Sequence, residues 1–177
     1  MVAAVIRVLI AYSTTDGHTV KICHEIKRVL ERLGHVVTLS DIGKTDQIEL
    51  PNFDKIVIGA SIRYGRHSPL VYEFIERHLS LLGAIPSAFF SVNIVARKPE
   101  KSSAETNPYL QRFLKQISWC PSQVAVFAGK LDYPSYRASD RLMIRLIMLL
   151  TGGPTAADTV VEFTNWQAVE TFGRSLA

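Results

Sequence analysis

The sequence contains little cysteine and no long uninterrupted apolar run. Cys23 and Cys120 are the only cysteines among 177 residues. Two cysteines without a spacing motif predict neither a disulfide framework nor a zinc site, so we expect reduced thiols and no metal. No apolar stretch reaches the roughly 20 residues that span a bilayer, and Arg7 interrupts the first apolar run, unlike a signal peptide. These absences predict a soluble or peripheral protein of the cytoplasm.

Common nucleotide-binding fingerprints are also missing. The chain has no GxGxxG motif, and the loop after its first apolar run lacks a Gly-Lys-Ser/Thr ending, which disfavours NAD and nucleoside triphosphates. The net charge of +4 and the pI near 9.2 favour an anionic partner. However, no basic run is interleaved with aromatic residues, so nucleic acid is not expected.

Apolar runs alternate with helical patterns along the whole chain. The pattern predicts strands over 6–12, 35–41, 54–61, 88–96 and 123–128. It predicts helices over 19–33, 69–83 and 107–117, and a last helix that Asn165 caps and that runs to Ala177. Near-continuous apolar strands separated by helices are typical of a parallel sheet covered on both faces. We therefore expect one α/β domain over 1–177, with a flavodoxin-like, doubly wound, five-stranded parallel sheet.

The segment 6–19 is read as a buried strand, a polar turn and the start of a helix. Free backbone N–H groups and the helix dipole at such a turn favour an anion. A terminal monophosphate suits the turn, while an ordinary capped helix start is the alternative. The candidate residues are Thr14, Thr15, Asp16, Gly17, His18 and Thr19.

Two further loops follow predicted strands, at the edge where open α/β sheets bind ligands. An apolar or aromatic side chain from each loop could flank a flat ring, although an aromatic such as Tyr64 is more often a plain surface residue. The candidates in the first loop are Ser61, Ile62, Arg63, Tyr64 and Gly65. Those in the second are Asn93, Val95, Ala96 and Arg97.

The segment 130–158 is too long for an ordinary connection and is interpreted as an insertion. It contains an apolar helical pattern over 139–150 that stops at Gly152-Gly153-Pro154. Arg137, Arg141 and Arg145 are four apart and would form one basic stripe. Two interpretations stay open: a core helix whose arginines reach the rim, or a helix lying in a membrane interface.

The phosphate loop and the five-strand plan resemble flavodoxins, which bind FMN. Longer runs over 57–65, 86–101 and 142–153 resemble the flavodoxin-like, menaquinone-dependent protoporphyrinogen IX dehydrogenases of bacterial haem synthesis. The resemblance covers nearly the whole chain. It implies an FMN whose phosphate lies on residues 14–19 and whose isoalloxazine lies between 61–65 and 93–97. Asp16 departs from flavodoxins, which usually have a hydroxyl residue there; we expect its carboxylate to point away from the phosphate and to cap the helix.

The same resemblance implies oxidation of protoporphyrinogen IX to protoporphyrin IX, with electrons passed to menaquinone or ubiquinone at the cytoplasmic face of the inner membrane. It suggests basic contacts to substrate propionates or lipid headgroups. The candidates are Arg97, Lys98, Lys101, Arg137, Arg141 and Arg145. A solvated set of surface charges is the alternative, and it weighs at least equally for Lys98 and Lys101.

No acid or base residue is assigned, because His18 and His67, although near the loops, more often have structural roles. The oligomeric state stays open, a homo-oligomer included. Two alternative functions are a flavodoxin-type electron carrier and an NAD(P)H:quinone reductase. The basic charge and the inserted helix argue against the carrier, and the missing dinucleotide fingerprint argues against the reductase.

Overall fold

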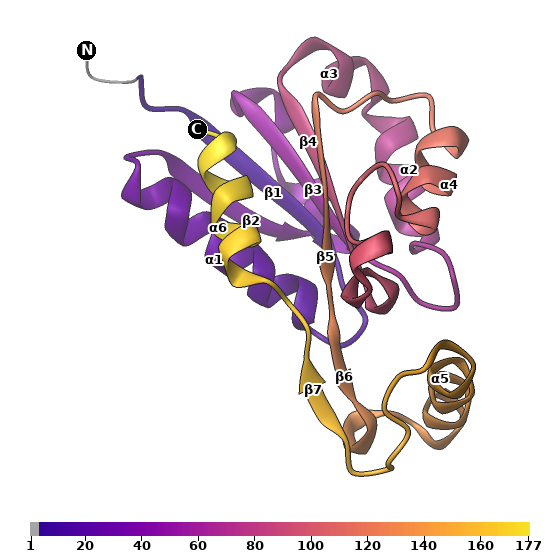
Figure 1. The fold of residues 1–177 in the computed structure, drawn as a ribbon. Helices are drawn as coiled ribbons and strands as arrows, with labels where there is room; N and C mark the ends of the chain where they lie inside the picture. Colours follow the sequence, from indigo (N-terminus) through magenta and orange to yellow (C-terminus); the bar gives the residue numbers. More distant parts are fainter. Residues whose placement is uncertain (1–3) are drawn as a thin grey trace.

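A five-stranded parallel sheet forms the centre of the structure, a computed structural model that describes residues 4–177 except the side chains of 45–47. Residues 1–3 of the predicted domain lie outside this range. The strands are β1 (Arg7–Ser13), β2 (Val36–Asp41), β3 (Lys55–Ser61), β4 (Ser87–Asn93) and β5 (Gln123–Ala128). Their order in the sheet is β2-β1-β3-β4-β5 (Figure 1). The predicted doubly wound fold is confirmed, and the order switches direction beside β1.

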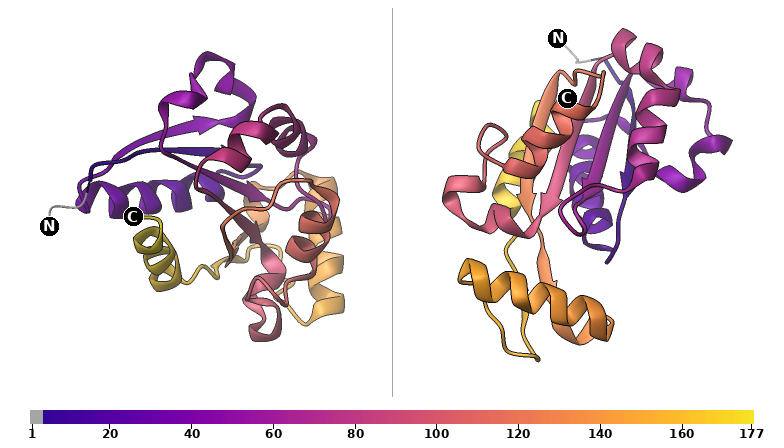
Figure 2. Two further views of the ribbon diagram at one scale, coloured as in Figure 1. Left: turned by 90° about the horizontal axis from the view of Figure 1, so that it is seen from above. Right: turned by 90° about the vertical axis from the view of Figure 1, so that its right-hand side faces the viewer.

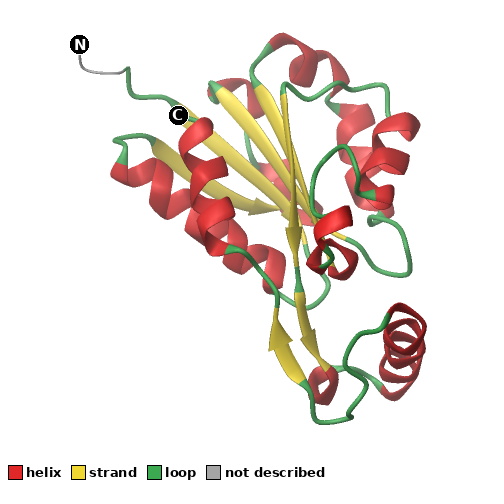
Figure 3. Ribbon diagram, viewed as in Figure 1, coloured by secondary structure: helices red, strands yellow, loops and turns green. Residues whose placement is uncertain are grey.

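Helices cover both faces of the sheet (Figure 3). One face packs against α1 (His18–Arg32) and α6 (Trp166–Ser175), and the other against α2 (Pro69–Arg77), α3 (Leu79–Ala84) and α4 (Pro108–Gln116). The apolar side chains of α1 recur at helical spacing, so Ile22, Ile26 and Leu30 are all fully buried. Short 3-10 segments η1 (Ile42–Gln47), η2 (Leu50–Asn52) and η4 (Pro99–Lys101) complete the connections.

The ends of the predicted helices follow from their capping residues. Asn107 and Asn165 each accept a hydrogen bond from the backbone N–H three residues on, at 3.1 Å, and so begin α4 and α6. Gly34, with φ of 91°, takes the left-handed conformation just beyond α1 that favours glycine. These boundaries are confirmed to within a few residues.

Two predicted elements were too long. The predicted strand 88–96 ends at Asn93, because the Asn93 side chain accepts a hydrogen bond from the Ala96 N–H at 3.1 Å and turns the chain into η3 (Ile94–Arg97). The predicted helix 69–83 is broken at His78, whose φ of −113° and ψ of 19° are not helical. The break separates α2 from α3, whose Leu82 still reaches the core.

The insertion after β5 projects beyond the carboxyl ends of the strands (Figure 2). It contains β6 (Lys130–Asp132), η5 (Tyr133–Ser135), α5 (Ala138–Thr151) and β7 (Val160–Glu162). The predicted helix 139–150 is confirmed, but the antiparallel pairing of β6 with β7 was not predicted and extends the insertion to residue 162. Two hydrogen bonds join its beginning to its end: Thr164 Oγ1 donates to the Ala128 carbonyl at 2.8 Å, and the Phe163 N–H donates to the Gly129 carbonyl at 3.1 Å.

Within residues 4–177, no helix has the length and apolar character needed to cross a membrane. Cys23 is buried in α1, Cys120 is exposed, and both are free thiols.

Candidate functional site at the carboxyl edge of the sheet

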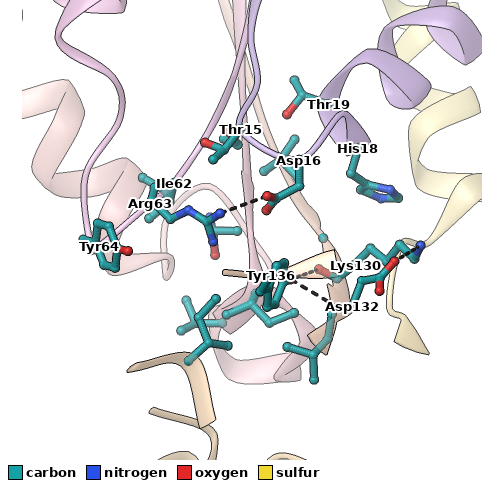
Figure 4. Close-up of a pocket in the computed structure, with 18 of the residues that line it drawn as sticks. Thr15, Asp16, His18, Thr19, Ile62, Arg63, Tyr64, Lys130, Asp132 and Tyr136 are labelled. Atoms are coloured by element: carbon teal, nitrogen blue, oxygen red, sulfur yellow. Dashed lines mark hydrogen bonds and ion pairs between the residues drawn. The ribbon is translucent and has the colours of Figure 1, made fainter. Parts of the chain in front are cut away.

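A pocket lies at the carboxyl edge of the sheet, between the strand ends and the insertion (Figure 4). The loops after β1, β3 and β4 contribute most of the predicted cofactor residues to its lining. These are Thr14, Thr15, Asp16, His18, Thr19, Ser61, Ile62, Arg63, Tyr64, Gly65, Asn93 and Val95. Gly17, Ala96 and Arg97 belong to the same loops but do not line the pocket.

The start of α1 is built to receive an anion. Gly17, at φ of 80°, precedes the helix, no side chain caps it, and its first turn contains no acidic residue. The Gly17 N–H donates to Thr14 Oγ1 at 3.0 Å, which holds the loop. Thr19 Oγ1 is the one buried side-chain polar atom in the described part of the chain that has no hydrogen-bond partner. A buried hydroxyl without a partner is costly, so an acceptor supplied by a ligand fits this position.

Asp16 does not cap α1, contrary to expectation. Its carboxylate lies 2.9 Å from the Arg63 guanidinium (Figure 4). The same guanidinium lies 3.8 Å from Asp140 at the start of α5. Burial raises the pKa of Asp16, the Arg63 charge opposes that shift, and Asp140 adds to it. The guanidinium therefore neutralises a carboxylate that would otherwise repel an anion in the pocket.

Tyr64 and Gly65 form a tight two-residue turn at the mouth of the pocket. Their φ angles are 51° and 80°, and Arg63 and Arg66 exchange backbone hydrogen bonds of 3.0 and 3.3 Å across the turn. Positive φ at both central positions defines a type I′ turn. An aromatic residue there is strained, and such strain is concentrated at functional sites. The ring is 58% exposed, and its hydroxyl donates to Asp140, which ties the turn to the insertion.

Asn93 supports the second loop from within. Its amide N–H groups donate to Ser91 Oγ at 3.2 Å and to Asn107 Oδ1 at 3.3 Å, and its carbonyl accepts from Ala96 and Asn107. The side chain is buried, as are Val95 and Ala96. Its polar atoms are thus already paired within the protein, and its effect on a ligand comes through the shape of η3.

The insertion supplies pocket residues that sequence reasoning missed. The ring centroid of Tyr136 lies 5.4 Å from the Arg63 guanidinium. The Tyr136 hydroxyl donates to the Lys130 carbonyl at 3.3 Å. The remaining residues that were not predicted come from the insertion, from α4 and from the end of β4 and the start of η3. They are Val92, Ile94, Tyr109, Gly129, Lys130, Leu131, Asp132, Ser135, Ile144, Ile147 and Met148. The available signal was positional, because a segment that follows β5 starts at the same edge as the other loops.

The two histidines have structural surroundings. His18 shares a hydrogen bond of 2.6 Å with Thr164 Oγ1, and burial lowers its pKa. His67 is buried against Phe89 and Phe113, hydrogen-bonded to Ser91 Oγ at 3.0 Å, and burial lowers its pKa to about 3. Both environments favour the neutral ring.

None of the six predicted basic contacts lines the pocket. Arg97 donates to Thr151 Oγ1 at 3.0 Å and so ties η3 to the end of α5. Arg141 and Arg145 donate through Nε to the carbonyls of Tyr133 at 2.9 Å and Thr155 at 2.8 Å. Two members of the stripe therefore hold the insertion together. Of the remaining three predicted basic contacts, Lys98 and Lys101 are half-buried and Arg137 is exposed.

Known proteins similar to this chain agree with its fold. The profile of the flavodoxin domain matches residues 9–158. The chain is 43% identical over 171 residues to protoporphyrinogen IX dehydrogenase (quinone) of Escherichia coli strain K12, covering 97% of this chain and 94% of that one. It is 45% identical over 170 residues to the protein of that name from Leishmania major, covering 96% and 74%.

Solved structures show the same fold at low identity. An archaeal flavodoxin aligns with a TM-score of 0.52 and 13% identity, covering 97% of this chain and 96% of that one. Oxidised flavodoxin 1 of Bacillus cereus gives 0.52 and 14%, covering 95% of both. This chain therefore belongs to the flavodoxin domain family. Within that family it stands with the relatives named protoporphyrinogen IX dehydrogenase (quinone), which confirms the predicted resemblance.

Proposed function

We propose that this chain is an FMN-dependent dehydrogenase that oxidises protoporphyrinogen IX to protoporphyrin IX and delivers the electrons to a membrane quinone, menaquinone or ubiquinone. The observation that carries the proposal is the full-length similarity, at 43% identity over 97% of the chain, to a protein of that name. This similarity extends over 171 residues, whereas the flavodoxin domain profile matches residues 9–158.

The pocket fits the phosphate end of FMN. The unpartnered Thr19 hydroxyl and the uncapped start of α1 together offer donors to a phosphate, and Arg63 offsets the charge of Asp16. FMN, when bound, supplies the hydride acceptor and the route by which electrons leave. Tyr64 and Tyr136 present aromatic rings near the space between the loops, and Ile144, Ile147 and Met148 keep that space apolar. No residue is assigned as an acid or base.

The outer side of α5 suits contact with the membrane that holds the quinone. Five apolar side chains on this helix are between 47% and 78% exposed, and they are Leu142, Met143, Leu146, Leu149 and Leu150. An amphipathic helix that lies in the interface buries such a face among acyl chains. The protein then binds peripherally at the cytoplasmic face of the inner membrane. Arg137, exposed at the start of α5, is the arginine of the stripe placed to meet headgroups.

Vesicle flotation tests the membrane contact. Replacing Leu146 and Leu149 together with Ser should weaken partitioning into anionic vesicles about a hundredfold, since burying a leucine contributes about 1.5–3 kcal/mol. Val160→Ser is the matched control, because Val160 is 52% exposed but lies on β7. Unchanged partitioning of the double variant would remove α5 from the contact.

The activity is tested anaerobically with FMN-loaded protein. Protoporphyrinogen IX should bleach the flavin while porphyrin fluorescence appears, and a menaquinone analogue should restore the flavin absorbance. A flavin that ignores porphyrinogen but is bleached rapidly by NADH would instead identify a quinone reductase. A flavin that responds to neither would identify an electron carrier.

A further inference from the structure

A second groove runs beside the pocket, between α2 and α4. The two share Tyr64, Gly65 and Tyr109, so the strained turn stands on the border between them. The groove continues over residues outside the pocket, which are Arg66, His67, Pro69, Tyr72, Glu73, Arg112, Phe113 and Gln116. None of these was a candidate for substrate contact in the sequence.

Two arginines in this groove have no partner among the described residues. Arg66 and Arg112 are exposed, and neither guanidinium makes a hydrogen bond or an ion pair within that part of the chain. Both lie close enough to Tyr72 to oppose the rise that burial causes in its pKa. Arg63, Arg97 and Arg141 differ, since each already binds a carboxylate or a carbonyl of the protein. The groove therefore holds two guanidinium groups that are not paired with the single carboxylate in its lining, that of Glu73.

Several aromatic side chains also line the groove. The Tyr72 hydroxyl donates to Gln116 Oε1 at 3.1 Å and joins α2 to α4, while its ring meets Phe113 edge to face at 5.3 Å between centroids. Tyr64 and Tyr109 continue this aromatic lining up to the pocket. Flat apolar surfaces with charged groups at one end suit a ring system that carries carboxylates.

We infer that the α2/α4 groove is the substrate subsite, with Arg66 and Arg112 binding the propionate carboxylates while the macrocycle reaches the pocket past Tyr64 and Gly65. This inference rests on the proposed function. It assigns the propionate contacts to Arg66 and Arg112 in place of the six basic residues that the sequence suggested, none of which lines this groove. Gly65 leaves room there, because a Cβ at this position would lie 3.6 Å from the Tyr109 ring and narrow the passage.

Steady-state kinetics of the FMN-loaded enzyme with a quinone analogue test the subsite. Arg66→Gln and Arg112→Gln should each raise KM for protoporphyrinogen IX about fivefold, in keeping with exposed ion pairs, and the double variant roughly twentyfold. The dimethyl ester of the same porphyrinogen, measured in the same detergent, lacks the carboxylate charges, so its KM should not change. Arg32→Gln, at the exposed end of α1 on the opposite face of the sheet, removes the same charge and should change neither KM.

A second variant predicts an effect of opposite sign. Glu73 lines the groove with its carboxylate and repels a dianionic substrate, so Glu73→Gln should lower KM for the free acid about twofold and leave the ester unaffected. Titration of each variant with protoporphyrin IX, followed by fluorescence, should give the same order of affinities without turnover.

The outcomes separate the inference from the function on which it rests. If the wild-type enzyme does not oxidise protoporphyrinogen IX, the proposed function fails. If it does, and the double arginine variant keeps the wild-type KM, only the subsite is refuted. An equal rise in KM for acid and ester would also refute carboxylate recognition, since the arginines would then act through the shape of the groove.

Discussion

The unpartnered hydroxyl of Thr19 predicts a substitution that helps the empty protein and harms cofactor binding. Thr19→Val replaces the hydroxyl with a methyl group of similar size at a fully buried position. In the free protein the change removes a polar atom that has no partner. In the proposed FMN complex it would remove a donor to the phosphate.

The two effects have different sizes. A buried polar group without a hydrogen bond costs about 1–3 kcal/mol, so the apo form of Thr19→Val should gain about 1 kcal/mol. For a chain of this length the gain corresponds to a Tm increase of roughly 2–4 °C. A hydrogen bond to a charged group contributes about 1.5–3 kcal/mol, so the Kd for FMN should rise roughly 10- to 100-fold.

Urea denaturation of the apo protein and flavin fluorescence titration measure the two quantities. Riboflavin, which has no phosphate, should bind Thr19→Val as it binds the wild type. Thr19→Ser is the matched control, because it keeps the hydroxyl and should keep FMN affinity while losing about 1 kcal/mol of stability with its methyl group. A Thr19→Val protein that is less stable than the wild type, or that binds FMN equally well, would refute the reasoning.

Two further predictions concern the core. Burial lowers the pKa of His67 to about 3 from its ordinary 6.5. Between these two pH values the unfolded chain binds a proton on this side chain that the folded protein does not bind. The free energy of unfolding should therefore fall by about 3 kcal/mol from pH 7 to pH 4. In urea denaturation at a series of pH values, His67→Gln should remove this fall in the free energy of unfolding. His24→Gln, which changes an exposed histidine, should keep it. A Cβ at Gly59 would overlap the Phe90 ring of the neighbouring strand, so Gly59→Ala should destabilise by about 1–3 kcal/mol. Gly83 lies in α3 with open space around it, so Gly83→Ala should stabilise the protein instead. Equal Tm values for the two alanine variants would contradict this account.

The fold was predictable from the sequence because its signals are local. Unbroken apolar strands, an amphipathic α1 and the asparagine caps of α4 and α6 each specify an element without reference to distant residues. The errors arose where a side chain or a tertiary contact decided the outcome. The amide of Asn93 ended β4, although the residues after it are apolar and β-branched, and β6 paired with β7 across the whole insertion.

The site was predictable only as far as the loops themselves. The order of strand, loop and helix placed residues 14–19 and 61–65 at one edge, and the structure brings them into one pocket. Spacing alone placed Arg141 and Arg145 on one basic stripe, whereas the carbonyls that pair them are supplied by the folded insertion. The ion pairs of Arg63 with Asp16 and Asp140 depend on where the folded insertion places Asp140 relative to the loops of the sheet. No local sequence pattern predicts that placement.

The hydrogen bonds that join the two ends of the insertion bear on how such a protein is assembled from parts. The Ala128 carbonyl at the end of β5 and the Thr164 hydroxyl just before α6 meet at 2.8 Å, so the insertion begins and ends at one point. A short linker between these two residues would therefore close the parent five-stranded domain without moving β5 or α6. Insertions at closely spaced chain positions are well tolerated by folded domains. We therefore expect the element that carries the exposed leucines to be separable from the domain by excision at this junction.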